Sequence, residues 1–544
     1  MMNTKRTRRV LIVDDLERWR RILSRVLERH DFSVDVAATM DEARQHLGQQ
    51  FYHLLVLDIR MKDDEEENIE GLDFLQEFRP IHKDKYRERI IAPTGVLMIS
   101  AYGTVEYAIK AFGSKVDDFI DKMHEDFNDL FFLRTVESIF KDMRINLDLQ
   151  IYWEGGLESA ADAMHNVRIG GRRIKRGQEP HALLTEELDD LMCRLFHRAD
   201  SIIVNPLTSG YSGAGVLRVL PFFKETGQAQ VAVVKFGDSK DIEQEYDNFN
   251  EFVSNFVGNR TQAETYFATP RLGGVVYTFV GTEVDATDDF ETFYREAGQA
   301  EIEDVLSRLV SNTCGTWYRN REQPGPYDLG REYRELLRLD ESSLDGIRQE
   351  RLRTIQGKAE LKFSTLSTDE SFPNPMLATA GQHFVRSVIR CVTHGDFNAQ
   401  NIRVDATGNS WLIDFERTGK GHILRDLARL DTVVRTQLLG ADEATLQERW
   451  EMEKTLAGVE RFSQLGTLST TFPNPAVEKA FATSLHLRRL AAQVIGVAGN
   501  DDIEEFFLPC LFYGMNTVRY HSLPKVQREH GMLSACVLAH RLGL

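Results

Sequence analysis

The sequence predicts an α/β fold in which a doubly wound parallel sheet is followed by a two-lobed α+β domain. Two observations predict this order. Near-continuous apolar runs alternate with helical periods in the first 145 residues, and beyond residue 186 extended segments give way to a long region of helical pattern. Strands that helices bury on both faces have such uninterrupted apolar runs. A chain of 544 residues exceeds one hydrophobic core, so we expect two or three domains.

Composition and charge restrict the class of protein. With 42% hydrophobic and 28% charged residues, the chain has the composition of an ordinary globular protein. No apolar run is long enough to span a bilayer and the N-terminus lacks a signal-peptide core, so we expect a cytoplasmic protein with no membrane partner. The net charge of -18 disfavours binding along nucleic acid. Five widely spaced cysteines suggest neither disulfides nor a zinc site.

The first 145 residues contain a repeated strand and helix pattern. The segments "RRVLIVDD", "FYHLLVLD" and "TGVLMIS" are apolar runs, and the pattern continues to "VDDFID". Between the first two runs, apolar residues recur at steps of three and four, as on one face of a helix. These residues are Leu16, Trp19, Ile22, Leu23, Val26 and Leu27. The repetition predicts five β/α units in one parallel sheet.

Polar residues stand where the predicted strands end. Asp14 and Asp15 close the first strand, and Asp58 closes the third. Ser100 closes the fourth, and Lys122 closes the fifth. The carboxyl ends of parallel strands meet at one edge of the sheet, where three carboxylates would repel one another without a cation. An all-oxygen site suits Mg²⁺, and the lysine and hydroxyl would hold phosphoryl oxygens. A single aspartate at a strand end would be interpreted as a helix cap, but five polar residues at the expected strand ends predict a site for Mg²⁺ and a phosphoryl group.

These residues resemble the response-regulator receiver family over about residues 7 to 142, and we assign the domain to 7–145. The resemblance implies a flavodoxin-like fold in which Asp58 accepts a phosphoryl group from a sensor histidine kinase. It also implies that Asp14 and Asp15 hold Mg²⁺ together with Asp58. It further implies that Ser100 and Lys122 contact the phosphoryl group and that Phe119 is the switching aromatic.

Two departures from the receiver pattern lie near the acceptor. Lys62 and Met123 stand where the family usually has prolines. Thirteen positions separate Asp58 from Gly71, about five more than usual, and the extra residues "DDEEEN" add negative charge. A solvated loop and a weakened encounter with the phosphodonor are both open interpretations.

The segment after residue 130 carries a short heptad pattern. It covers about two heptads, fewer than a convincing coiled coil needs. Its apolar residues are Leu133, Val136, Phe140, Met143 and Leu147. A last helix extended into a stalk, and hence a homodimer, remains open beside simple packing on the sheet. We interpret 146–185 as a helical and basic linker, with "GGRRIKRGQ" at 170–178 as a solvated hinge and not a nucleic-acid contact.

The C-terminal two-thirds contain the side chains that phosphoryl transfer from ATP requires. In "HGDFNAQN", Asp396 precedes Asn401 by five positions, and Asp414 in "WLIDFE" follows thirteen later. An acid of this kind accepts a hydroxyl proton, and an amide with a second acid binds Mg²⁺. Apolar alternation on both sides of "ATGN" predicts a β-hairpin between them.

A nucleotide cradle is predicted upstream. The segment "LTSGYSGAGVLRV" places glycines between two extended segments, where backbone N–H groups can approach phosphates. Its cofactor-binding residues are Gly210, Ser212, Gly213 and Gly215. Lys235 follows near the end of the strand "VAVVKFGD". In the helical stretch after it, Glu245 would pair with Lys235, with Glu243 as the alternative.

The order of these motifs resembles the aminoglycoside phosphotransferase and choline kinase branch of the protein-kinase-like fold. The likeness covers about residues 186 to 440, and we assign an N-lobe to 186–285 and a helical C-lobe to 286–544. It implies that Asp396 is the catalytic base and that Asn401 and Asp414 bind Mg²⁺. It also implies that Lys235 contacts the ATP phosphates and that Glu245 pairs with this lysine. Asp426 matches a structural aspartate of the family, and "YTFVG" at 277–281 would form the adenine hinge.

The likeness has departures of its own. The glycine segment reads G-x-x-G-x-G, and His394-Gly395-Asp396 replaces the His-Arg-Asp of protein kinases. Without that arginine, no pairing with a phosphorylated activation loop is available, so control would come from the receiver.

Three functions remain to be compared. The first is a receiver-controlled, ATP- and Mg²⁺-dependent kinase whose acceptor, a small hydroxylated or aminated molecule or a protein, is open. The second is a non-catalytic module that binds nucleotide or protein; Asp396 disfavours it, because a nucleotide holder needs no base. The third, a transcriptional regulator, lacks a basic helix-turn-helix pattern.

Overall fold

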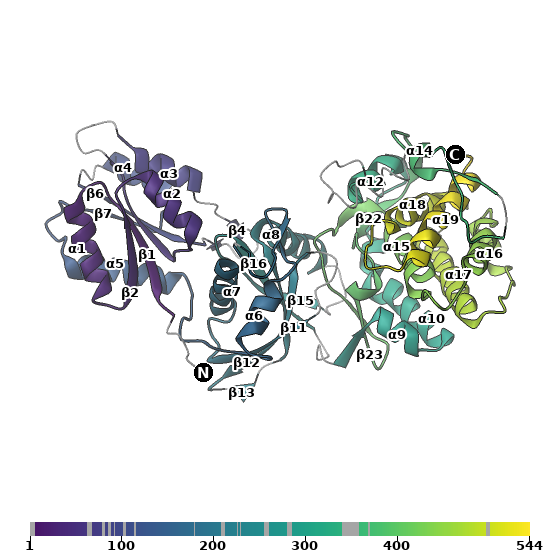
Figure 1. Ribbon diagram of the computed structural model, residues 1–544, viewed down its shortest axis with the longest axis horizontal. Helices are drawn as coiled ribbons and strands as arrows, with labels where there is room; N and C mark the ends of the chain where they lie inside the picture. The colour runs from purple at the N-terminus through teal and green to yellow at the C-terminus, as the bar shows by residue number, and fades with distance from the viewer. Residues whose placement is uncertain are drawn as a thin grey trace. The chain divides into compact units, whose positions relative to one another are not determined.

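The structure, a computed structural model shown in Figure 1, divides the chain into two compact units. The first unit comprises Met1–Tyr246 and Ala263–Thr278, and the second comprises Asp247–Gln262 and Phe279–Leu544. The structure describes residues 6–544 except 62–67, 79–81, 85–88, 92, 102–104, 114–115, 179, 208–212, 226, 229, 255–260, 280–285, 340–357, 368–369 and 497–500.

The N-terminal domain is built on a five-stranded parallel sheet in the order β2-β1-β3-β6-β7. Its strands are β1 (Arg8–Val13), β2 (Phe32–Ala37), β3 (Leu54–Asp58), β6 (Gly95–Ser100) and β7 (Asp118–Asp121). A short hairpin, β4 (His82–Asp84) with β5 (Arg89–Ile91), lies outside this sheet. The parallel sheet predicted from the apolar runs is confirmed, because every pairing within it is parallel.

Helices cover both faces of this sheet (Figure 1). Two helices pack on the face that carries Val10 and Ile12: α1 (Glu17–Glu28) and α5 (Asp129–Asp142). Three pack on the face that carries Leu11 and Val13: α2 (Met40–Gln49), α3 (Glu70–Phe78) and α4 (Val105–Gly113). Successive residues of a strand point to opposite faces, so each strand must be apolar throughout.

The heptad pattern does not extend the last helix of this domain into a stalk. Helix α5 ends at Asp142, with Met143 as its C-cap, and Leu147 lies outside any helix. Val136 and Phe140 are buried against the domain's own sheet, and Met143 packs beside them. Packing on the sheet therefore accounts for the apolar spacing, and the stalk interpretation is wrong for this helix.

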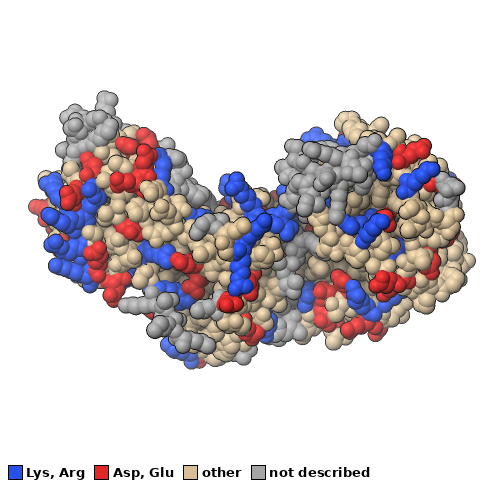
Figure 2. All heavy atoms as spheres, viewed as in Figure 1, with Lys and Arg blue, Asp and Glu red and all other residues tan. Residues whose placement is uncertain are grey.

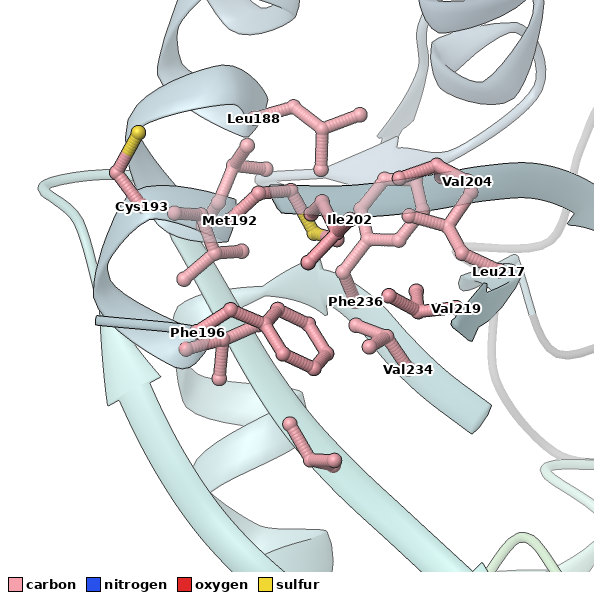
Figure 3. Close-up of a cluster of buried hydrophobic side chains, with 14 of the residues drawn as sticks. Leu188, Met192, Cys193, Phe196, Ile202, Val204, Leu217, Val219, Val234 and Phe236 are labelled. Atoms are coloured by element: carbon pink, nitrogen blue, oxygen red, sulfur yellow. The ribbon is translucent and has the colours of Figure 1, made fainter. Parts of the chain in front are cut away.

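A second sheet follows in the same unit, with the strand order β15-β16-β14-β12-β11-β8. Its strands are β8 (Gln150–Trp153), β11 (Ser201–Leu207), β12 (Gly215–Phe223), β14 (Ala232–Asp238), β15 (Thr261–Ala268) and β16 (Leu272–Phe279), and β13 (Gly227–Gln228) pairs with β12. Figure 3 shows side chains of α7 (His181–Leu195) packing on those of β11, β12 and β14. Helix α8 (Ser239–Asn248) continues as a π-helix, Phe249–Val253.

Residues 146–185, which we expected to form a linker, are part of this second sheet and its core. Strand β8 pairs in parallel with β11, and Leu149 and Leu184 are fully buried. Helix α6 (Leu157–Met164) also packs here. The stretch 170–178 contains no simple hinge either, because β9 (Arg168–Ile169) and β10 (Arg172–Arg173) form a hairpin, and Ile174 after them is buried. Only four residues of β8 enter the sheet, too few for a clear period.

The second unit is mainly helical. Its helices are α9 (Phe290–Glu296), α10 (Gln299–Arg308), α11 (Gly315–Arg319), α12 (Leu329–Leu336), α14 (Pro375–Ala378), α15 (Arg425–Val433), α16 (Leu446–Ala457), α17 (Pro475–Ile495), α18 (Glu504–Thr517) and α19 (Lys525–Arg541). The short strands that frame the candidate site are β17 (Thr287–Asp289), β22 (Arg390–Thr393), β23 (Ile402–Asp405), β24 (Ser410–Leu412) and β25 (Gly419–His422). The other short strands are β18 (Gly325–Asp328), β19 (Glu360–Leu361), β20 (Phe372–Pro373) and β21 (Val385–Val388).

The predicted hairpin around "ATGN" is confirmed. Strands β23 and β24 pair antiparallel, with Ile402 opposite Leu412. The Asp405 carboxylate caps the turn by accepting the N–H groups of Thr407 and Asn409. This hairpin fixes the chain between Asn401 and Asp414.

The surface carries both signs of charge. On the face that Figure 2 shows, basic and acidic side chains occur over both units, so the net charge of -18 is not gathered into one acidic surface on that face. Among the described residues, no helix is long and apolar enough to cross a membrane.

Candidate functional site

The acid pocket of the N-terminal domain, defined by Asp14, Asp15 and Asp58, lies at the carboxyl edge of the parallel sheet. One carboxylate oxygen from each lies within 4.8 Å of the others. Lys122, which follows β7, donates from Nζ to Asp14 Oδ2 at 2.5 Å and to Asp58 Oδ2 at 2.6 Å. Asp14 and Asp58 are fully or almost fully buried, so the lysine is their main compensating charge. The structure brings these four predicted residues together.

Burial dominates the electrostatics of the Asp58 carboxyl. Burial raises the pKa of the Asp58 carboxyl to about 7; Asp14 adds to the rise, and Lys122 opposes it. Crowded carboxylates favour a divalent cation, and three oxygen donors within this distance fit Mg²⁺. When bound, Mg²⁺ would neutralise the acids and polarise an incoming phosphoryl group.

The remaining receiver positions surround this pocket. Ser100 is buried at the end of β6, and its carbonyl accepts the N–H of Lys122 at 2.7 Å. Phe119 is half-buried against the α2–α4 side of the core. Met123, in place of a family proline, is 70% exposed. Lys62 and most of the acidic insertion lie outside the described residues.

The position of Gly71, just after the acidic insertion, requires a glycine. A Cβ at this position would lie 2.0 Å from the carbonyl oxygen of Asp58. Its N–H also donates to Ile59 at 3.0 Å. Only glycine permits this close approach, so α3 begins directly against the acceptor's backbone.

A buried contact connects the N-terminal domain to α7 of the second sheet. His53, just before β3, accepts the N–H of Arg9 on Nδ1 at 2.9 Å, so its proton is on Nε2, which donates to Asp190 Oδ1 at 2.8 Å. Asp190 also accepts from Arg194 Nε at 2.8 Å. Burial alone would raise the pKa of Asp190, but Arg194 and His53 hold it below its ordinary value.

Ion pairs surround this buried contact. Arg9 pairs with Glu186 at 2.8 Å, and Arg6 bonds Asp189, the neighbour of Asp190. Arg271 of the second sheet donates to the carbonyl of Leu47 at 3.0 Å. Acidic residues of α7 thus face basic residues at the amino edge of the parallel sheet, opposite the acid pocket. Sequence reasoning missed this contact, since a single histidine before a strand carries no pattern.

The glycine turn, defined as Gly213 to Gly215, leads into β12, which begins at Gly215. Gly213 has a φ of +84°, and a Cβ on Gly215 would lie 2.2 Å from the ring of Phe236. Pairing of β12 with β14 places Val216 opposite Lys235. The turn therefore ends beside the predicted phosphate lysine. Gly210 and Ser212 lie outside the described residues.

Lys235 takes part in a buried ion pair. Its Nζ donates to Glu245 Oε2 at 2.6 Å, and both side chains are almost fully buried. Glu245 is thus its partner, as predicted, in preference to Glu243. Tyr277 of β16 donates its hydroxyl to Glu245 Oε1 at 2.8 Å. The tyrosine was assigned only to an adenine hinge. Of the other predicted hinge residues, Thr278 and Phe279 end β16, and Val280 and Gly281 lie outside the described residues.

In the second unit, buried groups hold the loop that carries Asp396. The Asp426 carboxylate, at the start of α15, accepts the N–H groups of His394 at 2.7 Å and Gly395 at 2.9 Å. His394 donates from Nε2 to the carbonyl of Ile413 at 3.0 Å. Gly395 has a φ of +85°, and a Cβ there would lie 2.2 Å from the carbonyl oxygen of Arg417. The loop is therefore fixed by its backbone.

Asn401 and Asp414 lie side by side at the base of the hairpin. The N–H of Ile413 donates to the carbonyl of Asn401 at 3.1 Å. Asn401 donates from Nδ2 to the backbone carbonyl of Asp396 at 2.9 Å, which leaves its Oδ1 for a metal. Asp414 has a φ of +70°, a conformation that aspartate tolerates and that clusters at functional sites. An amide oxygen and a carboxylate are suitable Mg²⁺ ligands.

The Asp396 side chain remains 29% exposed. Arg429, one turn after Asp426 on α15, brings Nε to 3.7 Å from Asp396 Oδ1. Arg429 is buried, and it donates from Nη2 to the Tyr520 hydroxyl at 3.2 Å. The arginine thus faces Asp396 without a short hydrogen bond to it, and the carboxylate remains partly open to solvent. Sequence reasoning missed Arg429, because its contact depends on the folding of α15 against the loop.

Comparisons with known proteins identify both parts of the chain. The response regulator receiver domain model matches residues 10–131, and the Ternary complex associated domain 9 model matches 200–341 and 344–511, more than half of the chain.

Two curated relatives each match a minor part of the chain. A putative response regulator NtrX-like of Rickettsia conorii (strain ATCC VR-613 / Malish 7) is 32% identical over 213 residues, 36% of this chain and 40% of that protein. The transcriptional regulatory protein ResD of Bacillus subtilis (strain 168) is 31% identical over 114 residues, 21% of this chain and 41% of that protein. The chain thus spans about two-fifths of the length of these relatives.

A solved response regulator receiver domain protein (CheY-like) from Methanospirillum hungatei JF-1 is 22% identical, with a TM-score of 0.21, over 25% of this chain and 97% of that chain. The buried acid pocket with Lys122 agrees with the receiver match. The chain therefore belongs to the Ternary complex associated domain 9 family and carries a response regulator receiver domain at its N-terminal end.

Proposed function

We propose that this response regulator is phosphorylated on Asp58 by a sensor histidine kinase and thereby controls an ATP- and Mg²⁺-dependent phosphotransferase of the protein-kinase-like fold. The acceptor is a small hydroxylated or aminated molecule. In this proposal residues 286–544 are the C-lobe, and residues 186–285 are the N-lobe. The protein works in the cytoplasm and needs no nucleic-acid partner.

One observation carries the proposal: the backbone of the Asp396 loop is fixed by buried groups, while its carboxylate stays partly exposed. Asp426 is fully buried, and its two carboxylate oxygens accept hydrogen bonds from the N–H groups of His394 and Gly395. Burying a carboxylate costs several kcal/mol unless hydrogen bonds compensate it. A buried acid, here Asp426, that fixes the position of a second, partly exposed acid, here Asp396, is typical of a preorganised catalytic base.

The first unit carries the residues that we assign to nucleotide binding. The buried ion pair of Lys235 and Glu245 fixes the lysine amine next to the glycine turn, where it would neutralise the α- and β-phosphates of ATP. Asn401 and Asp414 would hold Mg²⁺, which supplies charge neutralisation of the phosphates when bound. Asp396 would then accept the proton of the acceptor hydroxyl.

The buried contact of His53 with Asp190 supports control by the receiver. It lies in the same compact unit as Asp58 and Lys235. A change in the receiver sheet on phosphorylation would alter the position of α7, whose other face packs on the strands that carry Lys235.

The Asp396→Ala variant tests the enzyme. We expect it to abolish Mg²⁺-dependent ATP turnover with any acceptor while the Kd for ATP stays within about threefold, because the base touches the acceptor and not the nucleotide. The exposed Asp442→Ala in the same unit is the control and should behave as the unchanged chain. Turnover unchanged in Asp396→Ala would refute the assigned base.

A non-catalytic binding module remains the second candidate, and one observation favours it. Gly213 and Gly215 are both explained by packing against protein side chains, Arg168 and Phe236, without any phosphate. In that case the chain would bind a nucleotide or a protein partner, with no ATP turnover whether or not Asp58 is phosphorylated.

A further inference from the structure

The basic hairpin, β9 and β10 over residues 168–173, lies outside every motif that the proposed function uses. Its strands pair with Arg172 opposite Ile169 and Arg173 opposite Arg168. The two turn residues, Gly170 and Gly171, have φ values of +56° and +77°. Two consecutive positive values suit a tight two-residue hairpin, so the glycines serve the turn. The hairpin is consequently a defined element that presents arginines.

Two backbone hydrogen bonds fix the basic hairpin beside the candidate phosphate site. The N–H of Arg168 donates to the carbonyl of Gly213 at 2.7 Å, and the N–H of Gly170 donates to Asp238 Oδ2 at 2.7 Å. Asp238 ends β14, three residues after Lys235, and β9 contacts β14. Ile174, just beyond β10, is 5% exposed and anchors the hairpin in the core of the second sheet.

The side chain of Arg168 runs across the glycine turn. A Cβ built on Gly213 would lie 2.8 Å from Arg168 Cδ and 2.9 Å from Cγ. The aliphatic stem of the arginine thus covers Gly213, and its guanidinium begins within one bond of this contact. Any group cradled by the turn would meet that charge.

The outer strand adds charge that the protein does not neutralise. Arg172 and Arg173 are exposed, and neither side chain has a hydrogen bond or ion pair among the described residues. Arg176, four residues after Arg172, instead pairs with Asp162 and Glu158. The chain has a net charge of -18, so two unpaired arginines close to Arg168 form a local basic region on an acidic protein.

We propose that the basic hairpin is part of the nucleotide site and that Arg168 and Arg173, which lie opposite each other and therefore on one face of the hairpin, bind the phosphates of a nucleoside triphosphate held at the glycine turn. The inference rests on the proposed function, since it takes ATP as the ligand. A planar guanidinium presents parallel donors that match phosphate oxygens, and two guanidinium groups on one face fit a polyphosphate better than a nucleoside. The hairpin would thereby supply charge that the glycine turn lacks.

The test compares ATP with adenosine, both by calorimetry on the full chain with Mg²⁺. Arg173→Ala should raise the Kd for ATP at least tenfold and leave the Kd for adenosine unchanged, whereas Arg172→Ala, on the other face of the hairpin, should bind ATP as the unchanged chain does. Both residues are exposed, so both variants should fold. Arg168→Met keeps an unbranched stem over Gly213 and removes the charge; it should also weaken ATP binding by several-fold. Arg176→Ala is the matched control, because that arginine is already paired, and it should bind as the unchanged chain does.

The outcomes separate the inference from the proposed function. If the unchanged chain binds ATP and Arg173→Ala binds it equally well, the inference is wrong and the proposed function stands. An equal loss for adenosine would also overturn the inference, because the hairpin would then act on the fold of the site. If the unchanged chain binds no ATP, the proposed function fails and takes the inference with it.

Discussion

The acid pocket and the Asp396 loop both present carboxylates, but they hold them by different means. In the acid pocket, Asp14 and Asp58 are buried, and the ammonium group of Lys122 bonds both. In the loop, backbone N–H groups and amide side chains fix the chain, while the Asp396 carboxylate reaches solvent. The acid pocket therefore depends on charge balance, and the Asp396 loop depends on backbone geometry. Variants should therefore affect them in different ways.

The largest effect is expected from Asp426→Ala. It leaves the buried N–H groups of His394 and Gly395 without an acceptor. Hydrogen bonds to charged groups contribute about 1.5–3 kcal/mol each, so we expect a loss of about 3–5 kcal/mol in the second unit. Denaturant unfolding measures it, with Asp442→Ala as the control. A loss below about 1 kcal/mol would show that the loop does not depend on Asp426.

Lys122→Met should give the next largest effect, and a cation should reverse it. Removing one partner of a buried pair typically costs about 3–5 kcal/mol, and here two carboxylates lose their lysine. Thermal unfolding with EDTA and with Mg²⁺ measures it; Mg²⁺ should stabilise this variant more than the unchanged chain. The exposed Lys141→Met is the control. Equal stabilisation by Mg²⁺ in both chains would contradict the charge-balance account.

Binding of Mg²⁺ should depend on pH in the acid pocket. Because the pKa of Asp58 is raised to about 7, a proton occupies the carboxyl below that pH and competes with the cation. The affinity for Mg²⁺ should fall by up to about tenfold per unit as the pH decreases from 7 to 6, and it should level off above pH 8.

Trp19 provides the readout for this titration, since its ring centroid lies 5.3 Å from Lys122 Nζ. Fluorescence at several pH values would give the Mg²⁺ affinity. Asp58→Asn should bind Mg²⁺ more weakly and with little dependence on pH. A flat profile in the unchanged chain would contradict the raised pKa.

The smallest effect is expected from Tyr277→Phe. It removes one hydrogen bond, to Glu245 Oε1, and leaves the ion pair of Glu245 with Lys235 in place. We expect a loss of about 1 kcal/mol and a Kd for ATP raised by less than about fivefold. The exposed Tyr152→Phe is the control. An ATP affinity reduced as strongly as by Lys235→Met would show that Tyr277 contacts the nucleotide.

Local patterns predicted the parts of the structure that local physics determines. The apolar runs identified the parallel sheet, and the strand ends located Asp14, Asp58 and Lys122. The spacing of Lys235 from the next helix gave its pairing with Glu245. Where the contact depends on distant segments, the sequence carried no signal: Arg168 meets Gly213 across 45 positions, and His53 meets Asp190 across 137.

The segment around β8 shows why the linker prediction failed. Four residues, Gln150–Trp153, form a strand only because β11 pairs beside them. Their burial alternates weakly, so neither a helical nor a strand period stands out. The basic stretch after it was interpreted as a hinge because glycines and arginines are common in solvated loops.

We propose that phosphorylation of Asp58 controls phosphotransfer by Asp396. The most direct measurement is the Mg²⁺-dependent turnover of ATP, with a panel of small hydroxylated and aminated acceptors, before and after treatment with acetyl phosphate. We predict that the rate changes several-fold in the unchanged chain, that Asp58→Ala abolishes this change but not the basal rate, and that Asp396→Ala abolishes both. An equal response to acetyl phosphate in Asp58→Ala, or undiminished turnover in Asp396→Ala, would contradict the account.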